Sequence, residues 1–69
     1  MLAAVIRRLR EERGETQEDL AFNVALSVGA VGRIERGAAN PTWTTVRKLA
    51  QVFEMTLAEL GEAVEREEG

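Results

Sequence analysis

The side chains able to act on another molecule are hydrogen-bonding and cationic groups rather than catalytic ones. The chain has no histidine and no cysteine, so it lacks the commonest general base, the commonest metal ligands and any disulfide. Its acidic residues fall at expected helix starts and on solvent-facing helix sides, not in a paired site. We therefore expect no enzyme, no cofactor, no metal site and no small-molecule ligand.

Two other side chains could bind a polyanion or the edge of a base. Arg33 can donate two hydrogen bonds to one guanine, a contact worth about 1–3 kcal/mol of discrimination between bases. Gln17 lies where a helix is expected to begin, and the free N–H groups of a helix start attract phosphate oxygens. The alternative is that Gln17 is simply an exposed polar residue.

The distribution of charge is compatible with a nucleic-acid partner, although the net charge of −3 is not favourable by itself. Residues 1–37 balance six Arg against five Glu and one Asp, and residues 38–53 add Arg47 and Lys48. Six Glu and one Arg lie in residues 54–69. Because the acid is concentrated in this last segment, the overall sign says little about the rest of the surface.

The elements that must position these groups are predicted to be helices, because apolar residues recur at helical spacing and no alternating strand pattern occurs. A hydroxyl residue precedes each of the last four periodic segments, as an N-cap does: Thr16, Ser27, Thr42 and Thr56. Gly14 and Gly37 stand where helices should end. One shared core is expected from Leu9, Leu20, Val24, Val31, Ile34, Val46, Leu49, Phe53, Leu57 and Leu60.

This pattern predicts a single compact all-α domain of five helices over residues 1–69, with an acidic C-terminal helix or tail at about 56–69. The two short helices within about 16–37 are joined by roughly three residues, which is the dimension of a helix-turn-helix. No apolar run is long enough to span a membrane, and the apolar start of the chain has no signal-peptide cleavage region. We therefore expect a cytoplasmic protein.

The residues at these positions resemble those of a known protein family. The segments "LREERGETQEDLA" and "SVGAVGRIERGAANPTWTTVRKLAQVFEMTLAEL", above all "IERG" at 34–37 and "NPT" at 40–42, are similar to the Cro/lambda-repressor-type, or Xre-type, helix-turn-helix family. The resemblance covers roughly residues 2–64. It implies a lambda-repressor-like DNA-binding domain and, as function, a transcriptional regulator, with repression expected, acting on an operator as a homodimer.

The same resemblance implies that base edges meet Val28, Gly29, Ala30 and Arg33 of the second helix of the pair. The family commonly has polar residues at the first three positions, whereas here none offers a side-chain hydrogen bond. Val28 and Ala30 can touch a thymine methyl, so direct recognition of bases should rest mainly on Arg33.

Phosphate contacts are expected from Gln17, Ser27, Asn40, Thr44 and Arg47, which would position the protein without recognising sequence. The acidic tail should point away from the duplex.

Other residues have implied structural roles. In the family the positions of Arg10 and Glu35 form an ion pair between the first and third helices; the alternative is two separate solvated charges. Ala25 occupies a turn position where the family usually has glycine, so a left-handed conformation there would be strained.

The dimer interface is expected at Leu57, Leu60 and Val64, unless all three pack inward. The surface expected around Val28 has only small or apolar side chains, and Phe22 is expected to be exposed nearby. These features leave a second function open: an antitoxin-like or anti-repressor-like module whose main partner is a protein.

Overall fold

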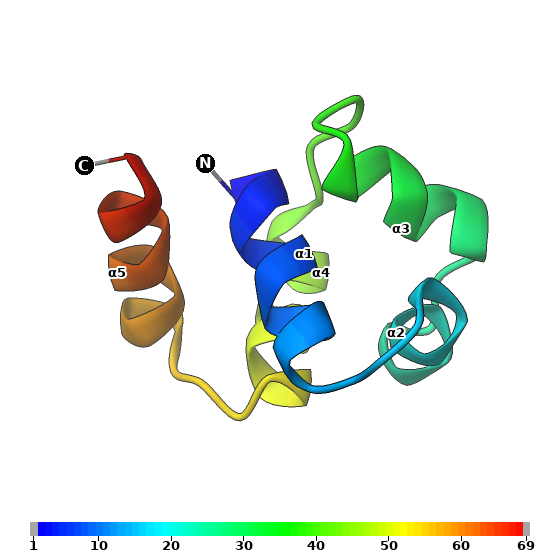
Figure 1. The fold of residues 1–69 in the computed structure, drawn as a ribbon, viewed down its shortest axis with the longest axis horizontal. Helices are drawn as coiled ribbons and strands as arrows, with labels where there is room; N and C mark the ends of the chain where they lie inside the picture. The colour runs from blue at the N-terminus through cyan, green and yellow to red at the C-terminus, as the bar shows by residue number, and fades with distance from the viewer. Residues whose placement is uncertain (1, 69) are drawn as a thin grey trace.

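The computed structural model describes residues 2–68, and five α-helices occupy this part of the chain. They are α1 (Leu2–Glu12), α2 (Gln17–Val24), α3 (Val28–Glu35), α4 (Trp43–Val52) and α5 (Leu57–Glu68). Figure 1 shows α1 and α4 in the middle, with α2 and α3 on one side and α5 on the other. The predicted five-helix all-α fold is confirmed; Met1 and Gly69, the ends of the predicted domain, lie outside the described residues.

Four of the helices begin at the hydroxyl residues that the sequence indicates. Each hydroxyl accepts a hydrogen bond from the backbone N–H three residues later, at 3.0 Å for Thr16, 3.1 Å for Ser27, 3.2 Å for Thr42 and 3.0 Å for Thr56. The backbone N–H of Thr16 in turn donates to the carboxylate of Asp19 at 2.9 Å, which completes a capping box. These bonds satisfy donors that a helix start otherwise leaves without a partner.

The first four helices all end in the same way. The first or second residue after each helix has a positive φ, namely 70° at Gly14, 58° at Ala25, 74° at Gly37 and 56° at Glu54. The next N–H then donates back across six residues, as from Leu26 to the carbonyl of Ala21 at 2.9 Å. This arrangement is a Schellman motif, which satisfies the last carbonyls of a helix. Ala25, where the sequence indicates that a left-handed conformation would be strained, does adopt that conformation.

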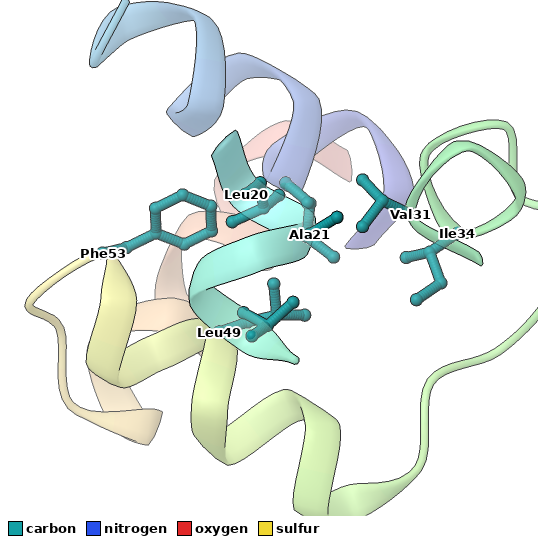
Figure 2. Close-up of a cluster of buried hydrophobic side chains, with 8 residues drawn as sticks. Leu20, Ala21, Val31, Ile34, Leu49 and Phe53 are labelled. Carbon is teal, nitrogen blue, oxygen red and sulfur yellow. The ribbon is translucent and has the colours of Figure 1, made fainter. Parts of the chain in front are cut away.

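The interior consists of two clusters of buried side chains, one on each side of α1 and α4. The larger cluster joins α1 and α4 to the α2–α3 pair: Ile6, Leu20, Ala21, Val24, Val31, Ile34, Leu49 and Phe53. Figure 2 shows six of these side chains, from α2, α3 and the end of α4, directed toward one another. The smaller cluster joins α1 and α4 to α5: Val5, Ala50, Leu60 and Ala63.

The predicted single core needs three corrections. It is divided in two, because α1 and α4 each bury residues on both sides, with Leu9 packed against both clusters. Leu57 is not a core residue, since 37% of its surface is exposed. Leu9 and Val46 are only partly buried. The face by which α5 packs inward is formed by Leu60 and Ala63, whose small side chain lets α5 approach the rest of the molecule closely.

Candidate nucleic-acid interface

The α2–α3 pair presents one side of α3 to solvent. Val31 and Ile34 of α3 are buried against α1, α2 and α4, so the opposite side of the helix faces outward. Gly29 and Arg33 lie on this outer side and are exposed, Val28 is 41% exposed and Ala30 is half-buried. The predicted base-contacting residues therefore form one continuous surface along the start of α3, and Figure 1 shows that α3 lies at the edge of the molecule.

The cationic side chains differ sharply in their surroundings from one helix to another. All four arginines of the α1 segment are paired with glutamates: Arg7 with Glu11, Arg8 with Glu12 and Glu67, Arg10 with Glu35, and Arg13 with Glu15. In contrast, Arg33 and Arg36 of the α3 segment form no ion pair with the described side chains of residues 2–67, and the same is true of the three cations on α4 and α5, which are Arg47, Lys48 and Arg66. Their charges are not neutralised locally and are available to an anion.

A buried carboxylate connects this surface to α1. Glu35 accepts hydrogen bonds from Arg10 at 2.7 Å and 3.1 Å, and its side chain is only 2% exposed. Gln17, the first residue of α2, donates to the same carboxylate from Nε2 at 3.1 Å. Arg10 and Glu35 thus form the ion pair that the resemblance implies, and they also hold the side chain of Gln17.

The pKa values of this network follow from its contacts. Burial raises the pKa of Glu35, but the hydrogen bonds from Arg10 and Gln17 together with the charge of Arg10 outweigh it, so the pKa lies below its ordinary value of 4.5. The hydrogen bond to Glu35 raises the pKa of Arg10 above its ordinary value. Both groups are therefore charged near neutral pH, and each stabilises the other.

The remaining residues predicted to contact phosphate lie on α4 or in the segment before it. Asn40 is exposed in the α3–α4 connection, beside Pro41, and it lines a hollow of about 330 Å³ with Ile34 of α3 and with residues of α1 and α5. Thr44 and Arg47 are exposed on α4 and line another hollow, of about 300 Å³, that also contains Leu57 of α5. The residues of the expected interface therefore fall into an α2–α3 group and a separate α4 group.

The residues predicted at the dimer interface lie around a third hollow, which is apolar. Leu57 and Val64 of α5 line this hollow of about 410 Å³ together with Leu2, Val46, Leu60 and Gly61. Leu60 itself is 2% exposed and belongs to the chain's own core, so the prediction that it offers interface surface is wrong. Trp43, which the sequence did not single out, forms another wall and is 66% exposed.

One further feature was not identified from the sequence. Arg36 lies one turn beyond Gly32 in α3, and its guanidinium lies above that glycine; a glycine four residues before an arginine in a solvent-facing helix was the available signal. Phe22, on the outer side of α2, is 86% exposed, as expected. Within residues 2–68, no helix is long and apolar enough to cross a membrane, and no three metal-binding side chains gather into a site.

The capped α2, the left-handed turn at Ala25 and the exposed outer side of α3 define a helix-turn-helix of lambda-repressor-like type. Residues 1–63 match the helix-turn-helix domain family. The chain belongs to this family, and its assignment to the Cro/lambda-repressor type is confirmed.

Sequence and structure comparisons agree with this assignment. Over 60 residues, which are 87% of the chain, it is 38% identical to the HTH-type transcriptional regulator DdrOP3 of Deinococcus deserti. Also over 60 residues, or 87% of the chain, it is 35% identical to the cryptic phage CTXphi transcriptional repressor RstR of Vibrio cholerae. The aligned part is 46% of DdrOP3 and 54% of RstR, so the chain spans about half the length of these curated relatives.

A solved structure is also similar over nearly the whole chain. A point mutant of the restriction-modification controller protein C.Esp1396I superposes with a TM-score of 0.87, covering 96% of this chain and 86% of that one at 32% identity. The names of all three proteins describe regulators or controllers, not enzymes.

Proposed function

We propose that this protein is a transcriptional repressor that binds an operator in double-stranded DNA as a homodimer, with α3 in the major groove. The observation that carries the proposal is that Arg33 and Arg36 lie exposed at α3 without a carboxylate partner among the described side chains of residues 2–67, whereas the arginines of α1 are paired with glutamates. The second helix of a helix-turn-helix enters the major groove, and unpaired cations on it suit a polyanion. The names of the relatives DdrOP3 and RstR support the same function.

Recognition of sequence in this proposal is direct at few positions. Arg33 donates to a guanine, while Val28 and Ala30 contact thymine methyl groups. Gly29 contributes no side chain, which lets the backbone of α3 approach the bases. The remaining preference comes from the shape and deformability of the DNA at positions that the protein does not touch.

Contacts to the DNA backbone set affinity in this proposal. Gln17 and the start of α3 at Ser27 bind phosphates on one side of the groove. Asn40, Thr44 and Arg47 form a second set from α4 and the segment before it. These contacts carry no sequence information and make binding dependent on salt. Because α5 lies on the opposite side of the molecule from α3 (Figure 1), its glutamates do not repel the duplex.

Dimerisation supplies a second helix-turn-helix for the second half-site of the operator. One helix-turn-helix covers one half-site, so a two-fold dimer is the usual way to reach operator affinity. Leu57 and Val64 are the proposed α5 contacts, and the apolar hollow beside Trp43 is continuous with them. In a two-fold interface the same patch meets itself, so this hollow on one copy faces the hollow on the other.

The test is binding of labelled duplexes by the intact protein and by Arg33→Ala. Sequences selected from a random DNA pool should bind more tightly than unselected duplexes. Arg33→Ala should remove most of this preference, by roughly tenfold for a contact of about 1–3 kcal/mol, while leaving non-specific affinity largely intact. As the matched control, Gln17→Ala should weaken binding to all sequences about equally. An Arg33→Ala protein with unchanged affinity and preference would disprove direct recognition by α3.

A second candidate function is favoured by one observation. Phe22 is 86% exposed on α2 and Val28 is 41% exposed on the adjoining α3. Both are apolar side chains that a protein partner can contact as well as DNA can. Such apolar residues suit an antitoxin-like or anti-repressor-like protein contact. Absence of salt-dependent binding to any duplex, together with an unchanged fold, would place this function first.

A further inference from the structure

Met55 lies in the short connection between α4 and α5 and packs against both clusters of the interior. Of the described side chains, only that of Leu9 also packs against both. The backbone N–H of Met55 closes the Schellman motif at the end of α4 by donating to the carbonyl of Ala50 at 2.8 Å. The way α5 packs on the rest of the molecule therefore depends on the contacts of this residue.

The side chain of Met55 can also be reached from outside the molecule. It is half-buried and lines the hollow of about 300 Å³ beside α4. Hydrogen-bond donors of α4 line the same hollow, namely Thr44, Arg47, Lys48 and Gln51. A small polar molecule can enter such a hollow, and these donors can bind an oxygen atom that is placed there.

The thioether of Met55 is the only side chain in residues 2–68 that a peroxide oxidises reversibly, because the chain has no cysteine and its other methionine is Met1. In this reaction sulfur donates an electron pair to one oxygen of hydrogen peroxide, so that an S–O bond forms while the O–O bond breaks. The departing hydroxide takes the proton of the transferred oxygen and leaves as water. Sulfur loses two electrons, the peroxide gains them, and the product is methionine sulfoxide.

The sulfoxide would not pack as the thioether does. Methionine is a flexible apolar side chain, whereas its sulfoxide is polar, and an acceptor buried without a donor is costly. Both clusters against which Met55 packs consist of apolar side chains, whereas donors such as Lys48 and Gln51 line the hollow. Oxidation therefore draws the side chain out of the clusters and into the hollow, which weakens the packing between α4 and α5.

We infer that Met55 is a modification site, at which a peroxide forms methionine sulfoxide and loosens α5 from the rest of the molecule. Because α5 carries Leu57 and Val64, the proposed dimer contacts, the same modification would separate the two copies and release the operator. The loosening of α5 follows from the contacts within one chain, whereas its effect on the operator rests on the proposed function.

The experiment treats the folded protein with hydrogen peroxide, locates the oxidised residue by mass spectrometry of its peptides, and measures thermal unfolding. We expect one added oxygen atom at Met55. We also expect the melting temperature to fall by about 4–8 °C or more, the shift that one unpartnered buried acceptor produces in a domain of this size. Methionine sulfoxide reductases with a thiol should reverse both changes.

Met55→Leu is the matched control, because leucine is apolar, similar in volume and not oxidised by peroxide. Its melting temperature should stay near that of the unmodified protein before and after treatment. This variant retains Met1 and Trp43, so a loss caused by their oxidation would still be seen. Met55→Gln places a polar group at the same position without any oxidant, and it should lower the melting temperature as oxidation does.

Three results would overturn the inference: no sulfoxide at Met55 of the folded protein, an unchanged melting temperature once the sulfoxide has formed, or an equal loss in Met55→Leu. Binding of a duplex selected from a random DNA pool, measured on the same samples, tests the link to the operator. Oxidation should lower the affinity of the unmodified protein and not that of Met55→Leu, and equal affinities would overturn this link. A protein that loses stability on oxidation but binds no duplex in either state would overturn the proposed function and leave the modification site in place.

Discussion

Glu35 is a buried carboxylate whose charge is satisfied by donors from two other helices. Arg10 donates to it twice and Gln17 once, and no buried side-chain N or O within residues 2–68 lacks a hydrogen-bond partner. Removal of one member of such a pair leaves an uncompensated charge, which costs more than the pair itself contributes.

We therefore expect Glu35→Ala to lower the free energy of unfolding by about 3–5 kcal/mol, as measured by urea denaturation. The double variant Arg10→Met, Glu35→Leu should recover most of this loss, because apolar residues of similar volume require no counter-charge. A double variant as unstable as Glu35→Ala would show that the ion pair is required for the fold itself.

The same carboxylate makes stability depend on pH in acid. The pKa of Glu35 lies below 4.5, and the hydrogen bond from the backbone of Thr16 lowers the pKa of Asp19 below 3.8. A carboxylate with a lowered pKa in the folded state contributes stability above its unfolded pKa, and this contribution is lost as pH falls through the folded pKa. The urea midpoint should thus be nearly constant above about pH 5 and should fall below about pH 4. Asp19→Asn should show a smaller fall, and a midpoint that rises in acid would contradict the assignment.

The four Schellman ends offer a test at the level of helices. A left-handed conformation costs a residue with a side chain roughly 1–2 kcal/mol, and Ala25 and Glu54 both adopt it, with φ of 58° and 56°. Glycine relieves this strain but adds freedom to the unfolded chain, worth about 0.4–1 kcal/mol. We expect Ala25→Gly to raise stability by up to about 1 kcal/mol, or about 4–8 °C in melting temperature.

The control for this variant is Ala4→Gly, which makes the same chemical change at an exposed position within α1. It should lower the melting temperature, because glycine is unfavourable inside a helix. If both variants lower the melting temperature equally, Ala25 carries no strain.

Helix boundaries were predictable because their signals are local. Thr16, Ser27, Thr42 and Thr56 each cap a helix through an N–H only three residues away. The prediction that Leu57 is a core residue was wrong because its burial depends on which face of α5 packs against α1 and α4. That face is formed by Leu60 and by Ala63, which an apolar pattern based on large residues underrates.

The arrangement of the residues proposed to face DNA was predictable only in part. The order of Gln17, Ser27 and Arg33 along the chain was sufficient to group them in one helix-turn-helix. The position of Arg36 over Gly32 and beside Gln17 depends on how α2 crosses α3, which no spacing in the sequence specifies.

The apolar hollow on the α4–α5 side predicts how two molecules associate. Trp43 is 66% exposed at its edge, and a buried tryptophan at the centre of an interface typically contributes 2 kcal/mol or more. Trp43→Ala should therefore weaken dimerisation roughly 30-fold or more, as measured by sedimentation equilibrium. Trp43 is the sole tryptophan, so its fluorescence should also change with protein concentration.

Phe22→Ala is the matched control, because Phe22 is also an exposed aromatic residue but lies on the α2 side of the molecule. It should leave the dimer intact. A monomer of the unmodified protein at high micromolar concentration would exclude dimerisation, and equal weakening by the two variants would exclude the hollow as its site.

The Schellman motifs described above are contacts between residues close in sequence, and such contacts favour fast folding. Each closes through a hydrogen bond that spans six residues, and each N-cap spans four. Proteins dominated by such local contacts cross their folding barrier in microseconds to milliseconds. If two copies must then meet, the encounter is second-order and slows as the protein is diluted, while folding does not. At low cellular abundance, the time needed to occupy an operator would then be set by the rate at which folded monomers associate.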